Sequence, residues 1–282
     1  MSVSWNSNYQ PTWCPGCGDW GILSGMKRAL TELELSPDQT AIVTGIGCSS
    51  KIAQYVNGYR LETLHGRALP NATGVKLANP ALTVIVNGGD GDGMGIGRGH
   101  FAHTARRNLD ITYFIHNNQI YGLTKGQTSP TSELGMVTGF TPAPMGNVED
   151  PINIVRTAIA DGATFVARTY CADLPHMVEI MKAAILHKGF AVVDILQPCV
   201  SFNQLNTYDW YKERVYRMAD EGYDRTNWSQ AIEAGNEWGE KIPLGIFYQV
   251  SSPTLDEKMG RGNLSDVPER GNLVDKLFAN FG

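Results

Sequence analysis

The chain contains 282 residues, 42% of them apolar and 18% charged, which is enough for one large α/β domain with an extension or for two small domains. Its net charge of −5 argues against a general attraction to nucleic acid or to anionic lipid. The first residues lack the charged-then-apolar order of a signal peptide, and no apolar run approaches the roughly 20 residues that span a bilayer. We therefore expect a soluble cytoplasmic protein with no membrane segment.

Short β-rich runs alternate with helix-like segments along the first 200 residues. The predicted strands, in chain order, are residues 41–44, 82–86, 111–116, 164–167 and 191–196. The predicted helices between them are residues 98–107, 151–160 and 174–187. Continuous apolar strands separated by helices indicate a parallel sheet covered on both faces. The pattern predicts an α/β fold with a doubly wound, mainly parallel sheet, whose ligands bind beyond the carboxyl ends of the strands.

The alternation becomes less regular from Val200 onward. Residues 200–228 are rich in Tyr, Trp, Asp and Arg, and residues 242–250 have the character of one further strand. We expect residues 1–200 to form the domain that carries the site. Residues 201–282 are expected to form a less regular C-terminal extension, too irregular for a second α/β domain.

A glycine-rich segment with two acidic residues, Asn87 to Gly95, directly follows the second predicted strand. Glycines let backbone N–H groups approach a diphosphate closely, and the helix that follows presents its positive N-terminus. The next predicted strand ends in Asn117-Asn118-Gln119-Ile120, and adjacent parallel strands bring the two loops side by side. Asp90, the side-chain oxygen of Asn118 and a nearby backbone carbonyl can then hold one Mg²⁺ against the phosphates.

Two other interpretations of this segment are weaker. Gly97-x-Gly99-x-x-Ala102 fits a loose nicotinamide-binding fingerprint, but it lies too far into the predicted helix, and Asn117 stands where an acidic ribose ligand is needed. Purely structural glycines in a tight turn would be the better interpretation of a lone glycine run. The pairing of Asp90 with an Asn-Asn pair at the end of the next strand favours the phosphate and metal site.

The order Gly89-Asp90-Gly91, then 25 residues, then Asn117-Asn118 resembles the signature of thiamine-diphosphate enzymes. That resemblance implies a thiamine-diphosphate-binding fold. It also implies Asp90 and Asn118 as Mg²⁺ ligands, with the backbone carbonyl of Ile120 as the third.

Five cysteines in a large chain without a secretory signal favour metal binding or catalysis over a disulfide framework. Cys14 and Cys17 form a CxxC pair, close enough to share a metal centre. Cys48 and Cys199 follow two of the predicted strands and therefore belong at the edge that carries the cofactor loops. Four cysteines at one edge are the ligand set of a [4Fe–4S] cluster.

A structural zinc ion is the competing interpretation of the cysteines, because the sequence CPxCG is also a common zinc knuckle. Zinc sites usually pair two such knuckles, whereas the other two cysteines here are single and far apart. A position beside a thiamine site favours the redox cluster, since the carbanion formed there can donate electrons. Cys171 has no partner pattern and is expected to be a small buried residue.

These motifs together resemble the β subunit of 2-oxoacid:ferredoxin oxidoreductases, of the pyruvate or 2-oxoglutarate type. The resemblance covers about residues 10–205 and includes the segments 13–18 (Trp-Cys-Pro-Gly-Cys-Gly), 45–49, 63–70, 72–80, 89–97 and 121–131. It implies a subunit of an oxidoreductase that oxidatively decarboxylates a 2-oxoacid to the acyl-coenzyme A, with ferredoxin as electron acceptor. The implied cofactors are thiamine diphosphate, Mg²⁺ and one [4Fe–4S] cluster, bound within residues 1–200.

The motif loops supply the candidate contacts of the cofactor. His65 is expected near the thiazolium or the reacting carbonyl, as the resemblance implies, and Lys51 can attract the substrate carboxylate or raise the cluster potential. Each has a simpler alternative, a structurally satisfied histidine and a surface lysine. The expected cofactor contacts are Gly47, Cys48, Ser49, His65, Gly89, Asp90, Gly91, Asp92, Asn118, Ile120, Gly122, Leu123 and Thr124.

A partner subunit is expected because thiamine diphosphate has two ends with different needs. The diphosphate needs the Mg²⁺ loop, and the aminopyrimidine needs an acidic residue that promotes ylid formation. Two separate α/β domains supply these in the superfamily, and the last ~80 residues here fall below the usual size of such a domain. An α subunit is expected to supply the second domain. A non-redox thiamine-dependent decarboxylase or synthase subunit with a structural zinc, or a catalytically idle metal-binding subunit, are the alternatives.

Overall fold

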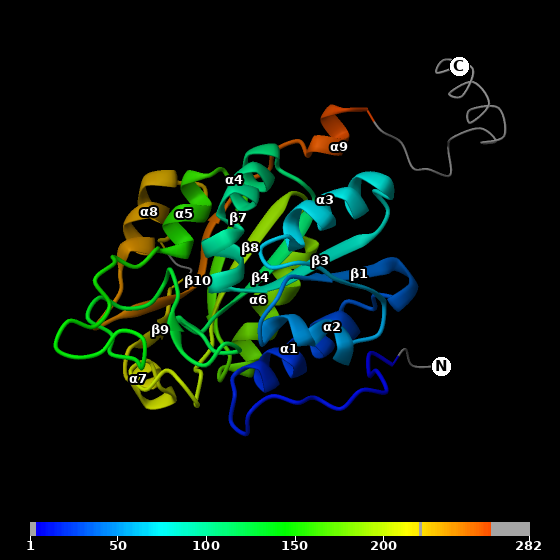
Figure 1. The fold of residues 1–282 in the computed structure, drawn as a ribbon. Helices are drawn as coiled ribbons and strands as arrows, with labels where there is room; N and C mark the ends of the chain where they lie inside the picture. Colours follow the sequence, from blue (N-terminus) through cyan, green and yellow to red (C-terminus); the bar gives the residue numbers. More distant parts are fainter. Residues whose placement is uncertain (1–3, 220–221, 261–282) are drawn as a thin grey trace, which may run out of the picture.

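The computed structural model describes residues 4–219 and 222–260, and it contains one eight-stranded sheet at its centre (Figure 1). The strands lie side by side in the order β2-β1-β3-β4-β8-β7-β10-β9. Their bounds are β1 Thr40–Thr44, β2 Tyr59–Glu62, β3 Thr83–Gly89, β4 Ile111–Asn117, β7 Phe165–Tyr170, β8 Phe190–Leu196, β9 Val215–Arg217 and β10 Ile242–Gln249. A separate two-stranded hairpin pairs β5 (Ile120–Tyr121) with β6 (Gln127–Thr128).

The six strands from β2 to β7 run parallel, and β10 pairs with β7 in the antiparallel direction. The prediction of a doubly wound, mainly parallel α/β sheet is therefore confirmed. All five predicted strands are present, with β3 and β7 each continuing three residues further than expected. The extra residues of β3 include two glycines, Gly88 and Gly89, which the sequence pattern assigned to the loop.

Helices cover both faces of the sheet (Figure 1). On one face α1, α2 and α6 pack against strand residues such as Ile42, Phe114 and Val193. On the other face α3, α4, α5 and α8 pack against alternate residues such as Val43 and Ile115. The helices are α1 Asp19–Glu32, α2 Ile52–Tyr55, α3 Ala68–Ala78, α4 Arg98–Arg107, α5 Ile154–Ala160, α6 Leu174–Leu186, α7 Tyr208–Lys212, α8 Trp228–Asn236 and α9 Leu255–Lys258. Strands buried on both faces explain their continuous apolar character.

The three predicted helices correspond to α4, α5 and α6. Only the start of α5 differs clearly, because the side chain of Asn153 accepts a hydrogen bond from the backbone N–H of Arg156 and caps the helix three residues later than predicted. The longest additional helix is α1, which directly follows the CxxC turn and buries Ile22, Met26 and Leu30 against α6.

The C-terminal residues contribute to the same sheet. The predicted strand at residues 242–250 is β10, and both β10 and β9 extend the sheet beyond β7. The expected division at residue 200 stays a prediction, and the part of the extension beyond residue 260 lies outside the described residues. Within residues 4–219 and 222–260, no helix is long and apolar enough to cross a membrane.

Candidate cofactor and cluster site

The loops after β3 and β4 meet at the carboxyl edge of the sheet. These strands are neighbours in parallel register, with Gly89 opposite His116, so Asp90 and Asn118 emerge side by side. The backbone N–H of Asn118 donates to Oδ1 of Asp90 at 3.4 Å, and the side-chain oxygen of Asn118 accepts from the N–H of Ile120 at 3.1 Å. Two oxygen ligands predicted from sequence therefore lie within one small volume.

The carboxylate of Asp90 is buried, with only 1% of the residue exposed. Its Oδ2 accepts from the hydroxyl of Ser129 and, at 2.6 Å, from the hydroxyl of Thr131. Burial raises the pKa of Asp90 above its usual value, because these hydroxyls and one N–H only partly compensate the lost hydration. A desolvated carboxylate held by neutral donors, beside an amide oxygen, fits a hard divalent cation.

A second acidic residue, Asp92, has a different environment two positions later. Its Oδ1 accepts from the N–H of Gly66 at 2.7 Å and from the N–H of Ile46 at 3.1 Å. The same oxygen lies 2.7 Å from Nδ1 of His65. Asp92 thus ties three loops together and fixes the imidazole of His65, whose side chain remains 41% exposed. The sequence pattern predicted Asp92 as a cofactor contact and did not reveal this anchoring contact.

All thirteen expected cofactor contacts line one cavity at this edge, together with Ile46 and Tyr121. Gly91 leaves no room for a side chain, since an added Cβ would lie 2.2 Å from the ring of Tyr121. The hydroxyl of Ser49 is buried in the wall and has no hydrogen-bond partner within the described residues. A ligand in the cavity can supply that partner. The cavity volume of about 100 Å³ is smaller than the roughly 300 Å³ of a pocket that encloses a drug-sized ligand. A cavity of this size can therefore enclose only one part of a cofactor such as thiamine diphosphate.

Four of the five cysteines surround a second cavity of about 250 Å³. Cys14 and Cys17 come from the turn before α1, where the N–H of Cys17 donates to the carbonyl of Cys14 at 3.1 Å. Cys48 follows β1 and Cys199 follows β8, as predicted. Cys171 lies outside this wall and is buried, as predicted.

The thiols stand apart around the cavity. Among the residues that the structure describes, no three His, Cys, Asp or Glu side chains converge as ligands of a single ion. A four-iron cluster is wider than one ion, so its thiolates surround a space instead of meeting at a point. Burial raises the pKa of Cys17 and raises that of Cys48 to about 11, so both thiols are protonated at neutral pH without a metal to displace the proton.

The charged residues that line the cysteine cavity, within the part of the chain that the structure describes, are two lysines. Lys51 lies there as expected, with its Nζ 3.3 Å from the hydroxyl of Thr12, and Lys125 is the second. A positive wall suits a group that carries anionic thiolates. The donor set and the charge of this cavity therefore fit an iron–sulfur cluster.

The two cavities share a wall. Cys48, Asn118, Gly122 and Leu123 line both of them. A Cβ added to Gly122 would lie 3.4 Å from Sγ of Cys199 and 3.8 Å from Sγ of Cys48. The backbone of Gly122 therefore lines the cofactor cavity within contact distance of two of the cysteines.

A buried polar chain that the sequence did not reveal connects the CxxC turn with the sheet. The thiol of Cys17 lies 3.5 Å from Oδ2 of Asp19, and Oδ1 of Asp19 lies 2.6 Å from Nδ1 of His116. The other ring nitrogen of His116 lies 3.1 Å from the side-chain oxygen of Asn87. Asp19 and His116 are fully buried. The signal available in the sequence was His116 within the predicted strand at residues 111–116.

Comparisons with known proteins agree with this geometry. Residues 45–195 match the family "Thiamine pyrophosphate enzyme, C-terminal TPP binding domain", and residues 199–263 match the family of the C-terminal part of the pyruvate ferredoxin oxidoreductase beta subunit. A 2-oxoacid:ferredoxin oxidoreductase 1 subunit beta from Aeropyrum pernix is 48% identical over 93% of this chain and 86% of the relative. A 2-oxoacid:ferredoxin oxidoreductase subunit beta from Saccharolobus solfataricus is 49% identical over 88% of this chain and 83% of the relative.

A solved structure is also similar. It is the 2-oxoglutarate:ferredoxin oxidoreductase from Magnetococcus marinus with 2-oxoglutarate, coenzyme A and succinyl-CoA bound. The TM-score is 0.89 at 40% sequence identity, over 96% of this chain and 94% of that chain.

Proposed function

The chain belongs to the β subunits of 2-oxoacid:ferredoxin oxidoreductases, and from that membership we propose which of its residues hold the cofactors and pass on the electrons. The protein is an oxidoreductase subunit with a thiamine-diphosphate-binding domain. The observation that carries the proposal is that the cofactor cavity, which contains Asp90, and the cysteine cavity share a wall at Cys48 and Gly122. Electrons released in the first cavity have a short path to a group held in the second.

Asp90, the side-chain oxygen of Asn118 and the backbone carbonyl of Ile120 are the proposed Mg²⁺ ligands. The ion would relieve the desolvated charge of Asp90 and hold the diphosphate near the backbone of Gly89 and Gly91. When bound, thiamine diphosphate supplies the carbanion chemistry that releases CO₂ from a 2-oxoacid. The residues that line the cavity would orient the cofactor.

Cys14, Cys17, Cys48 and Cys199 are the proposed ligands of one [4Fe–4S] cluster. When bound, the cluster accepts electrons one at a time and delivers them to ferredoxin. The alternative of a structural zinc ion requires four ligands at about 2.0–2.3 Å from the ion. Among the described residues, no three His, Cys, Asp or Glu side chains are placed to hold one metal ion. The cysteine cavity, with a volume of about 250 Å³ and four thiols in its wall, favours the cluster.

His65 and Lys51 are the proposed polar groups beside the reacting atoms. Since Asp92 occupies Nδ1 of His65, the Nε2 atom is the one available to hydrogen-bond a substrate oxygen or to hold a proton. Lys51 on the cysteine cavity offers a positive charge to the substrate carboxylate or to the cluster. The positions of His65 in the cofactor cavity and of Lys51 in the cysteine cavity support these roles.

The proposed active site is divided between this chain and a partner subunit. A cavity of about 100 Å³ encloses only part of the cofactor, and the described residues form one eight-stranded sheet and a two-stranded hairpin, with no second α/β domain for the aminopyrimidine. We expect an α subunit to supply the activating acid. The assembled enzyme would convert a 2-oxoacid, coenzyme A and two oxidised ferredoxins to the acyl-coenzyme A, CO₂, two reduced ferredoxins and a proton. The substrates named for the Magnetococcus marinus enzyme belong to this class.

The cluster assignment is tested by two serine substitutions of buried cysteines that follow neighbouring strands. Cys199→Ser should lose most of the iron and the visible absorption of the anaerobically purified complex, because one ligand is removed. Cys171→Ser is the matched control and should keep both. Equal iron content in the two variants would contradict the proposed ligand set.

A further inference from the structure

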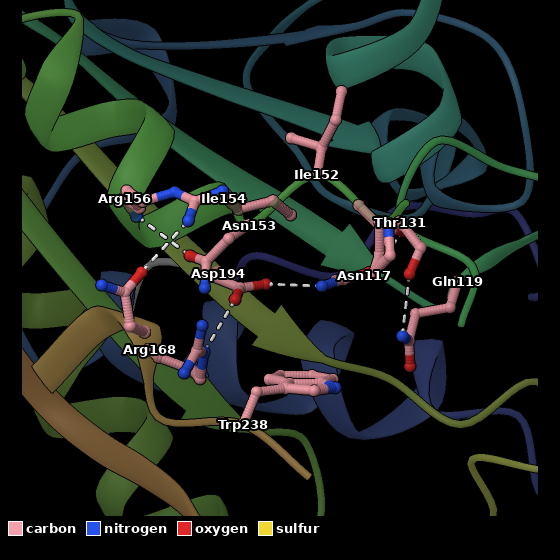
Figure 2. A pocket seen from close by; sticks show the side chains of 12 residues that line it. Asn117, Gln119, Thr131, Ile152, Asn153, Ile154, Arg156, Arg168, Asp194 and Trp238 are labelled. Carbon is pink, nitrogen blue, oxygen red and sulfur yellow. Dashed lines mark hydrogen bonds and ion pairs between the residues drawn. The ribbon is translucent and has the colours of Figure 1, made fainter. Parts of the chain in front are cut away.

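A third cavity lies beside the start of α5 and the end of α8 (Figure 2). Its volume is about 180 Å³. The base is formed by Arg168 of β7 and Asp194 of β8, which are directly opposite each other in the parallel register. Arg156 of α5 and Trp238, just after α8, form part of the wall.

The guanidinium of Arg168 is buried in this base, with 1% of the residue exposed. Its Nε donates to Oδ2 of Asp194 at 2.8 Å. The guanidinium carbon lies 5.1 Å from the ring centroid of Trp238 and 5.4 Å from that of Phe247. The Nη1 of Arg168 has no hydrogen-bond partner among the described residues. A buried donor without an acceptor is energetically unfavourable, so a ligand that supplies an acceptor oxygen would be stabilised here.

The side-chain oxygens around the cavity already accept hydrogen bonds from the protein. Asn117 donates to Oδ1 of Asp194 at 3.0 Å, and Arg156 donates through its backbone to Asn153 and through Nη1 to Asn236. Among the described residues of the wall, the buried donor that lacks a hydrogen-bond partner is therefore the guanidinium of Arg168. Two arginines and one aspartate are the charged residues of the wall, which leaves a net positive charge.

We propose that this cavity binds a small oxyanion, a carboxylate or a phosphate, through Arg168 and Arg156. Oxygen acceptors bind a guanidinium best in its plane, along its N–H groups. The volume has room for one small anion or several waters and is too small for a nucleotide. The cavity shares no lining residue with the two cavities of the proposed active site, and the hydroxyl of Thr131 in its wall donates to the proposed metal ligand Asp90. No role in catalysis is required for it.

Hydrogen–deuterium exchange of the assembled complex tests the site without relying on turnover. The probes are inorganic phosphate and succinate, each added at matched ionic strength against chloride. We expect exchange in peptides from residues 150–160 and 228–240 to slow by about two-fold or more with at least one probe. Phosphate bound at the cofactor loop would instead slow exchange around residues 89–97, which separates the two sites.

Three variants complete the test. Arg168→Gln and Arg156→Gln should both lose the slowing, and Arg156→Gln is informative even if the first variant misfolds, because Arg156 is exposed. Arg217→Gln is the matched control, since Arg217 pairs with Asp173 away from the cavity, and it should keep the response. A response to phosphate alone identifies a phosphate site, one to succinate alone identifies a carboxylate site, and responses to both identify a general oxyanion site. No slowing in the unsubstituted complex, or equal slowing in both arginine variants, overturns the proposal.

Discussion

Asp90 and Asp92 are buried carboxylates two residues apart, and replacing each with asparagine should change stability in opposite directions. Asp90 is held by two hydroxyls and one long N–H contact, and burial raises its pKa above the ordinary value of 3.8. A carboxyl whose pKa is raised by folding binds its proton more tightly in the folded state. Its ionised form therefore destabilises the cofactor-free protein as the pH rises through the raised pKa. Asp90→Asn removes that charge and should stabilise the cofactor-free chain at neutral pH.

The magnitudes follow from the contacts of each carboxylate. Removing an uncompensated buried charge at Asp90 should contribute about 1 kcal/mol, a rise in melting temperature of about 2–4 °C. Asp92 accepts from two backbone N–H groups and contacts His65 at 2.7 Å. Weakening such charge-assisted bonds by Asp92→Asn should cost about 1.5–3 kcal/mol, a fall of about 3–12 °C. The two variants are matched in chemistry and position.

Thermal unfolding with and without thiamine diphosphate and Mg²⁺ measures both effects. Ligand at a hundred-fold excess over its dissociation constant stabilises a protein by about 2.7 kcal/mol, equivalent here to about 5–10 °C. The unsubstituted protein should show this rise and Asp90→Asn should not. If Asp90→Asn keeps the full rise with ligand, the assignment of Asp90 as a metal ligand is refuted. If Asp90→Asn lowers the melting temperature of the cofactor-free protein, the argument from its buried charge is refuted.

Two further predictions concern the thiols and the partner. In the reduced, cluster-free chain, exposed Cys14 should alkylate fastest with iodoacetamide at neutral pH. Cys48 and Cys171 should react slowly because burial raises their pKa values to about 11 and about 12, and raising the pH should speed both. Comparable rates for the three thiols at neutral pH, measured by mass spectrometry, would contradict this. The chain purified alone should bind its cofactors yet fail to oxidise pyruvate or 2-oxoglutarate until the α subunit is added, and robust turnover by the single chain would disprove the divided active site.

Much of the fold was predictable because strands buried on both faces leave a continuous apolar signal. The runs that became β3, β4 and β8 were located nearly to the residue at their starts. Strand β2 carries no such signal, since all four of its residues are exposed at the edge of the sheet. The start of α5 depended on the Asn153 cap, a local hydrogen bond that periodicity does not encode. The addition of β9 and β10 to the same sheet depends on long-range pairing that sequence spacing leaves open.

The candidate site was predictable where chemistry follows strand ends. Asp90, Asn118, Cys48 and Cys199 all come shortly after strands, and parallel topology brings such residues to one edge. Contacts between distant loops were not predictable in the same way. The contact between Asp92 and His65 joins residues 27 positions apart, and the contact between Asp19 and His116 joins residues 97 positions apart. Arg168 is hidden by its position inside an apolar strand, where only the register with Asp194 reveals the ion pair.

Reduction of the cluster by a 2-oxoacid tests the central claim most directly, because it requires both cavities to work together. The anaerobic complex, mixed with pyruvate or 2-oxoglutarate and coenzyme A in the absence of ferredoxin, should lose visible iron–sulfur absorbance. Asp90→Asn should retain the iron and show no such bleaching, and Cys48→Ser should lose both the iron and the bleaching. Bleaching that persists in Asp90→Asn, or iron that persists undiminished in Cys48→Ser, would contradict the coupling of a thiamine-diphosphate site to a cysteine-bound cluster in this chain.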